Sequence, residues 1–167
     1  MSLKDTIKED MKTAFKAGDT ATRSTLTMLL SVIQNRELEK RAKLMKSGAA
    51  TEAEVAGKSQ LTDEETIEAV SSEMKKRKDS AAQFIAGGRP ELAASEEAEA
   101  SVLMKYMPEQ LTEDAVKALI TEAIAATGAA GVKDMGRVMG AVAPKTKGKF
   151  DGARVNQLVK EALAAAA

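Results

Sequence analysis

Apolar residues recur three and four positions apart along most of this chain, the spacing that places side chains on one face of a helix. No segment alternates polar with β-branched apolar residues, which is the pattern typical of strands. The sequence therefore predicts an all-α protein of about seven helices. The apolar stripes of the first four helices are expected to comprise Leu3, Ile7, Met11 and Phe15; Leu26, Leu29, Leu30 and Ile33; Ile67, Val70, Met74, Ala81, Phe84 and Ile85; and Leu92, Leu103, Tyr106 and Met107.

Capping residues indicate where several of these helices begin. Ser2 with Asp5, and Thr62 with Glu65, have the spacing of a capping box, in which side chain and backbone bond reciprocally at a helix start. Residues 47–60 have weak periodicity and only one large apolar residue. We expect a mobile connector there rather than a helix.

Pro108 separates two distinct helical patterns. The four helices before it have enough apolar positions for a core of their own. After it, Thr112 can cap a fifth helix, and two shorter helices follow. We therefore predict an N-terminal helical domain of about four helices over residues 1–107 and a three-helix domain over residues 108–167.

The last two helices flank a loop rich in Gly, Lys and Pro. Pro144 is expected to end the first of them, because proline has no backbone N–H and restricts the residue before it. Asp151 can cap the second helix by accepting hydrogen bonds from its free amides. The apolar faces of the two helices are predicted to comprise Val132, Met135, Met139 and Val142, and Val155, Leu158, Val159, Ala162 and Leu163.

Basic residues gather in this C-terminal region, although the whole chain has 25 basic and 25 acidic residues. Residues 131–163 contain seven Lys and Arg against three Asp and Glu, a surplus of four. Gly148 and Gly152 would let a ligand approach the backbone closely. We predict a phosphate-contacting, nucleic-acid-binding surface formed by Lys133, Arg137, Lys145, Lys147, Gly148, Lys149, Gly152, Arg154, Asn156 and Lys160.

Three other motifs have simpler structural interpretations. The basic run at residues 75–78 spreads around a helix, so we interpret it as a solvated girdle. Gly136 and Gly140 form a G-x-x-x-G motif, which we attribute to close packing of a helix against a neighbour. Glu96, Glu97 and Glu99 are expected on an exposed helix face.

Composition excludes several kinds of chemistry. The chain has no Cys and no His, so it has neither a thiolate zinc site nor the commonest general base. We expect no metal, no cofactor and no catalytic residue. It contains three Phe, one Tyr and no Trp, which weakens any proposal of base stacking. Without a signal-like or membrane-spanning run, we expect a cytoplasmic protein with no membrane partner.

One long motif resembles a known family. Residues 135–163 read MGRVMGAVAPKTKGKFDGARVNQLVKEAL, which is similar to the C-terminal signature of the GatB/YqeY family. Further similarity lies at residues 106–111, at Arg23-Ser24-Thr25-Leu26 and on to the N-terminus. The resemblance covers essentially the whole chain against stand-alone YqeY-like proteins. Against the tail of GatB, a subunit of tRNA-dependent amidotransferases, it covers about the last third.

The resemblance implies tRNA-directed binding and carries over no catalytic residue. We expect a non-catalytic protein that binds tRNA or associates with amidotransferase subunits or aminoacyl-tRNA machinery. An alternative is a carbon–nitrogen ligase that uses glutamine as amido donor, although the sequence shows neither a glutaminase nucleophile nor an ATP site. A second alternative is a protein–protein adaptor that binds a partner helix around Leu103 and Met107.

Overall fold

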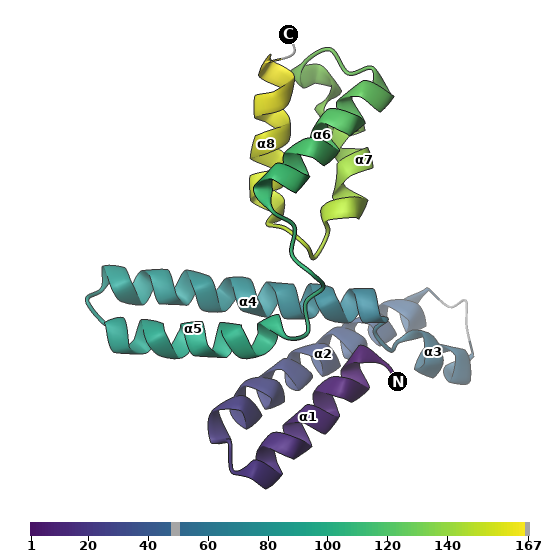
Figure 1. Ribbon diagram of the computed structural model, residues 1–167. Helices are drawn as coiled ribbons and strands as arrows, with labels where there is room; N and C mark the ends of the chain where they lie inside the picture. The colour runs from purple at the N-terminus through teal and green to yellow at the C-terminus, as the bar shows by residue number, and fades with distance from the viewer. Residues whose placement is uncertain (48–50, 166–167) are drawn as a thin grey trace. The chain divides into compact units, whose positions relative to one another are not determined.

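The computed structural model describes residues 1–47 and 51–165, and within them every regular element is helical (Figure 1). The all-α prediction is confirmed. The described residues form eight α-helices and one 3-10 helix: α1 (Leu3–Ala17), α2 (Thr20–Lys46), α3 (Glu52–Lys58), α4 (Asp63–Ala86), α5 (Pro90–Met104), α6 (Glu113–Thr127), η1 (Val132–Asp134), α7 (Met135–Thr146) and α8 (Gly152–Ala165).

The chain divides into two compact units, Met1–Met107 and Pro108–Ala167, which we call the N-terminal unit and the tail unit. Each unit has its own cluster of buried apolar side chains. The division falls at the proline that separates the two sequence patterns. Whether each unit folds alone stays a prediction.

The N-terminal unit is built from two helical hairpins, α1–α2 and α4–α5, that pack together through α2. The capping boxes at Ser2 and Thr62 are both present, and Pro90 occupies the first turn of α5 as its fixed φ favours. The core follows most of the predicted stripes and contains Ile7, Leu26, Leu29, Ile33, Ala69, Val70, Met74, Leu103 and Tyr106.

Phe15 continues the predicted apolar stripe of α1, but its side chain is 61% exposed. Residues Leu3, Ile7 and Met11 are each four apart, and a four-residue step advances 400° around a helix of 3.6 residues per turn. The buried face therefore drifts, and Ala14 takes the next inward position. Phe15 lies about 100° further around the helix, on the solvent side.

Two other residues of the predicted stripes are exposed near the turn between α4 and α5. Ile85 is 59% exposed and Leu92 is 37% exposed. This turn extends beyond α1 and α2 in Figure 1, so no third helix of the unit covers its apolar residues. The helical period identifies a common face correctly here, but it does not show how far along the hairpin that face is covered.

The connector expected over residues 47–60 is wrong in part, because residues 52–58 form α3. Thr51 and Glu54 make a third capping box, and Val55 is buried. Residues 48–50 of the predicted connector lie outside the described residues. The helix is short enough that one buried side chain gives no visible periodicity, although its capping box can be found in the sequence.

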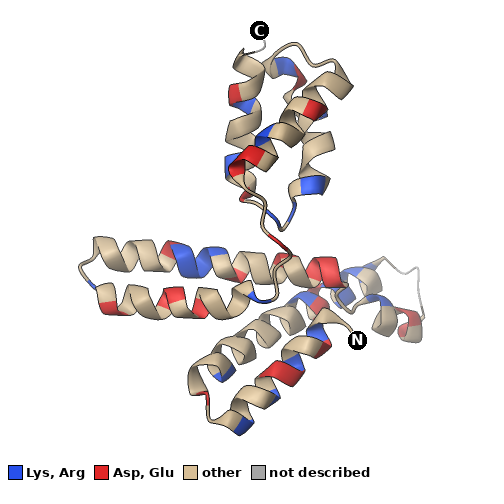
Figure 2. Ribbon diagram, in the orientation of Figure 1, with Lys and Arg blue, Asp and Glu red and all other residues tan. Residues whose placement is uncertain are grey.

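The basic run on α4 is not a uniformly solvated girdle. Arg77 has a side chain only 17% exposed, and its Nε lies 2.8 Å from Oε2 of Glu99 and 3.7 Å from Oε2 of Glu96. These two glutamates are therefore half-buried against α4 rather than on an exposed face. Lys75 and Lys78 are exposed as expected, and the basic band on α4 is visible in Figure 2.

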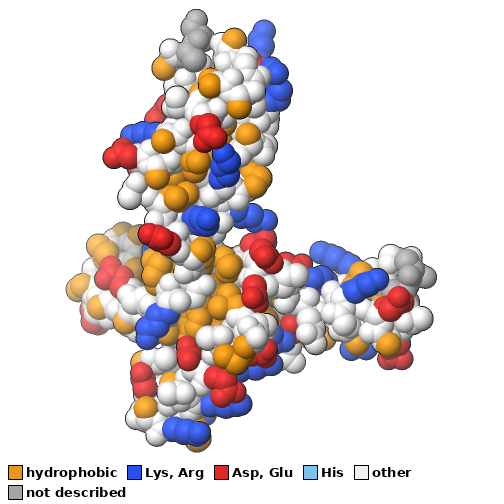
Figure 3. Space-filling view, turned by 45° about the vertical axis from the view of Figure 1, so that its right-hand side comes forward, with side chains coloured by type: hydrophobic (Ala, Val, Ile, Leu, Met, Phe, Trp, Pro, Cys, Tyr) orange, Lys and Arg blue, Asp and Glu red, His pale blue; other side chains and the backbone are white. Residues whose placement is uncertain are grey.

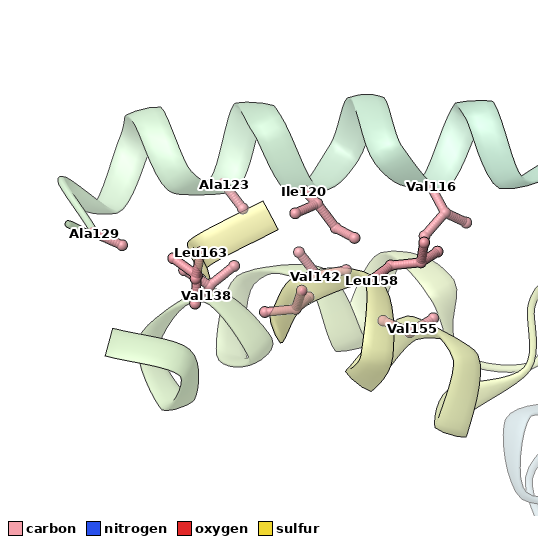
Figure 4. Close-up of a cluster of buried hydrophobic side chains, with 10 residues drawn as sticks. Val116, Ile120, Ala123, Ala129, Val138, Val142, Val155, Leu158 and Leu163 are labelled. Atoms are coloured by element: carbon pink, nitrogen blue, oxygen red, sulfur yellow. The ribbon is translucent and has the colours of Figure 1, made fainter. Parts of the chain in front are cut away.

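The tail unit packs α6 across α7 and α8 (Figure 4). Val116, Ile120 and Ala123 of α6 face Val142 of α7 and Leu158 of α8. Thr112 caps α6 through the backbone N–H of Ala115, as predicted. This core fixes the two helices that flank the basic loop.

Candidate nucleic-acid interface

Helix α7 continues past Pro144 and ends at Thr146, which corrects the prediction that the proline stops it. The last turn is closed by the Lys147 N–H, which donates to the Ala143 carbonyl at 2.9 Å. The Thr146 hydroxyl donates to the Val142 carbonyl at 3.1 Å. Lys145 therefore lies on the helix, and the loop itself comprises residues 147–151, which we call the basic loop.

The backbone of the basic loop is held by several hydrogen bonds. Gly148 has a φ of 72°, a left-handed conformation that favours glycine. The Gly148 carbonyl accepts from Nε2 of Gln110 at 3.0 Å, and the Lys149 carbonyl accepts from the Leu111 N–H at 2.8 Å. The Lys149 N–H in turn donates to the Thr146 carbonyl at 2.9 Å. The loop therefore has a defined backbone, and Lys147 and Lys149 are exposed on it.

Asp151 caps α8, as predicted: its Oδ1 accepts from the Arg154 N–H at 2.7 Å. Its carbonyl accepts from the Val155 N–H at 2.9 Å. The carboxylate thus occupies the amide that an anion would use at this helix start. The lysine side chains are therefore the candidates for phosphate contact.

Arg154 is engaged by acidic residues of the same unit. Its Nε and Nη2 donate to the two carboxylate oxygens of Glu113 at 3.0 and 2.9 Å, and its Nη1 lies 3.6 Å from Glu161. Hydrogen bonds from Arg154 and then Lys117 lower the pKa of Glu113 to about 2. A fork-to-fork pair of this kind is specific in geometry. Arg154 therefore connects α8 to the start of α6.

Two other predicted cations also have carboxylate partners. Arg137 is paired with Asp134, and its Nη1 is 3.4 Å from the Thr127 carbonyl. The hydrogen bond from Arg137 lowers the pKa of Asp134, which also accepts from the Ala130 N–H. Lys145 lies 3.3 Å from Glu122. In contrast, three exposed cations of the predicted set have no carboxylate partner among the described residues: Lys133, Lys149 and Lys160.

The structure does not bring the ten predicted residues into one patch. Arg137 and Lys147 lie near opposite ends of α7, and ten residues of helix separate them by about 15 Å along its axis. Lys160 lies eight residues into α8 from Gly152, about 12 Å from the basic loop. Figure 3 shows Lys and Arg of the tail unit at separate places, with Asp and Glu between some of them.

The glycines of α7 face solvent, which corrects their assignment to close helix packing. A Cβ built at Gly136 or Gly140 would meet no atom within 4 Å. The same holds for Gly152 at the start of α8. Asn156 is exposed on α8. These residues add accessible surface near the cations without adding charge.

Within the described part of the chain, no group of His, Cys, Asp or Glu could hold a metal ion. Nor does any single helix there have the length and apolar character to cross a membrane. Helix α6 and the segment Val132–Thr146, which comprises η1 and α7, reach that length and composition only as a pair with a 94° bend between them. Their apolar residues form the core of the tail unit.

The family comparison covers most of this structure. The family model described as Yqey-like protein matches residues 44–163, which include all of α3 to α7 and most of α8. The chain belongs to the YqeY-like family. The motif at residues 135–163 lies inside the match, whereas Arg23-Ser24-Thr25-Leu26 and the whole of α1 lie outside it. A comparison with curated proteins gave no match.

Proposed function

We propose that this YqeY-like protein binds tRNA through phosphate contacts of its tail unit and does not itself catalyse a reaction. The observation that carries the proposal is the basic loop. Its backbone is fixed from residues 110–111, while the Lys147 and Lys149 side chains are exposed. Because the backbone is already ordered, a contact of Lys149 with a phosphate would require ordering of that side chain only.

The roles of the other cations follow from their partners. Arg154 would have to give up two hydrogen bonds to Glu113 before it could bind a phosphate. Lys145 would compete with a weaker contact at 3.3 Å. Lys133 and Lys160 are exposed but lie away from the basic loop, so they would contact different phosphates from those near Lys149.

The attraction to RNA would come from a few lysines and not from the net charge of the whole chain. Since the chain has 25 basic and 25 acidic residues, no net charge of the whole molecule attracts a polyanion. Binding would depend on a few lysines and would be salt-sensitive. Phosphate contacts also position an RNA without reading its sequence, so we expect similar affinity for different tRNAs. In this role the protein would present tRNA to amidotransferase subunits or other aminoacyl-tRNA machinery.

The carboxylates support the non-catalytic part of the proposal. General acid–base catalysis works best with a group whose pKa is near the working pH. Seven Asp and Glu side chains have a lowered pKa, and the pKa of Glu113, at about 2, is lowered furthest. These carboxylates are capping or ion-paired groups, so they are ionised and already engaged near neutral pH.

Binding of labelled tRNA to the full chain tests the proposal. We expect the double variant K147A/K149A to weaken binding, whereas K75A/K78A should bind like the wild type because it removes the same charge from α4. Equal binding by the two double variants would refute the site. The protein should also show no glutaminase or ATPase turnover, and activity abolished by one point substitution would refute the non-catalytic assignment.

A further inference from the structure

Phe15 has the most exposed aromatic ring of the described residues. The chain has only three Phe and one Tyr, and Phe84, Phe150 and Tyr106 are half-buried or buried. Phe15 is 61% exposed on the last turn of α1, beside the turn that joins α1 to α2 (Figure 1). It therefore contributes little to a core, whereas Tyr106 lies in the core of the N-terminal unit and Phe150 packs against that of the tail unit.

Arg23, near the start of α2, lies over this ring, with its guanidinium carbon 4.7 Å from the ring centroid. That distance is within the range of a cation–π contact. Arg23 has no carboxylate partner among the described residues. The ring remains 61% exposed with the guanidinium over it, so a second planar group could still stack on the pair.

Other cations surround the α1–α2 turn. Between residues 12 and 24 the chain has Lys12, Lys16 and Arg23 against a single acid, Asp19, and the Lys12 ammonium already lies 2.7 Å from Glu9 of α1. The Asp19 carboxylate caps α2, where it accepts from the Thr22 N–H at 3.0 Å. That hydrogen bond lowers the pKa of Asp19 most, and the charge of Lys105 adds a smaller effect.

We infer that the Phe15–Arg23 pair binds an unpaired base of a single-stranded RNA segment. An aromatic ring beside a guanidinium offers two planar surfaces on which any base can stack, and nearby lysines suit the flanking phosphates. A protein partner would be expected to cover a continuous apolar area, whereas the residues around Phe15 are mainly Lys, Thr and Asp. The inference shares with the proposed function only the assumption that RNA is the ligand. The Phe15–Arg23 pair lies on the N-terminal unit, outside the family match.

The test uses the full chain and a fluorescein-labelled single-stranded oligoribonucleotide of about eight nucleotides. Fluorescence anisotropy gives its Kd with the wild type, F15A, F15Y and R23Q. The matched controls are I85A, which truncates an apolar side chain that is 59% exposed, and R89Q, which removes an exposed arginine elsewhere in the same unit. Because Phe15 is exposed, F15A should fold normally, as circular dichroism would verify.

Loss of one stacked base should weaken binding by F15A about 5- to 150-fold. F15Y should restore it, R23Q should weaken it, and I85A and R89Q should leave it unchanged. The same strand without bases should bind the wild type and F15A equally, because stacking requires a base. Equal weakening by F15A and I85A, or an F15A effect that persists on the strand without bases, would overturn the inference.

The variant K147A/K149A separates this inference from the proposed function. If it binds tRNA normally while F15A loses the single strand, the proposed function fails and the inference stands. If K147A/K149A loses tRNA binding while F15A and the wild type bind the single strand equally, the inference fails and the proposed function stands.

Discussion

Removal of Lys147 and Lys149 should reduce the salt dependence of tRNA binding by a calculable amount. Each phosphate contact contributes about 0.7–0.9 to the slope of log Kd against log salt concentration. If each lysine contacts one phosphate, K147A/K149A should flatten the slope by about 1.4–1.8. Between about 50 and 200 mM salt, the variant should then lose about 7- to 12-fold less affinity than the wild type.

The ion pairs of the tail unit refine this expectation. K145A should change the slope less than K149A, because the Lys145 ammonium is 3.3 Å from Glu122 and has a partner before RNA arrives. Arg154 should contribute little for the same reason, since Glu113 holds two of its nitrogens. The order of effects, Lys149 above Lys145 and Arg154, is therefore as informative as the size of the combined change.

Anisotropy of labelled tRNA at four or five salt concentrations would measure the slope. The control is K75A/K78A, since both lysines are exposed on α4. Lys76 is unsuitable as a control because it lies 2.6 Å from Glu73, whose side chain is only 8% exposed, and its removal would leave a buried carboxylate unpaired. An unchanged slope in K147A/K149A, or an equal change in the control, would refute the phosphate role of the basic loop.

Three further predictions test the fold. A fragment of residues 1–107 should melt cooperatively by circular dichroism, because its core lies entirely within that range, and an unfolded fragment would contradict the boundary. G140A should raise the Tm by about 2–8 °C, since the added methyl group meets open space and reduces the freedom of the unfolded chain; a lower Tm would mean that α7 packs there. The pKa of Glu113 is lowered from 4.5 to about 2, so its stabilising effect is complete above pH 4.5 and is lost as pH falls toward 2. The difference in Tm between wild type and E113Q should disappear over that interval, and a constant difference would exclude the ionised pair as its cause.

The sequence predicts the helices of this protein well because each carries its own signals. Ser2, Thr62 and Thr112 all cap the helices assigned to them, since a capping bond depends only on residues three positions apart. The exception is α3, whose single buried side chain, Val55, is too little for a periodic pattern. The prediction that Pro144 ends α7 is wrong because the proline removes only one hydrogen bond. The surrounding hydrogen bonds of that turn still form.

Burial is harder to predict because it depends on neighbours that are distant in sequence. Phe15 continues a four-residue repeat, but the inward face has drifted to Ala14 by that point of α1. Gly136 and Gly140 have the spacing of a packing motif, but the partner helices lie on the opposite side of α7, against Val138 and Val142. A repeat shows which residues share a helix face, and tertiary packing decides whether that face is buried.

The same reasoning explains why the candidate surface is only partly visible in the sequence. Seven cations against three acids suggests free charge when only residues 131–163 are counted. Glu113 and Glu122 lie outside that range, and the fold brings them to Arg154 and Lys145. The cations left for RNA are then mainly lysines, which bind phosphate as point charges without the bidentate geometry of arginine. A base stacked on Phe15 would also be held with little regard to its identity. If both proposals hold, the protein distinguishes RNAs by where phosphates and unpaired bases are accessible rather than by sequence.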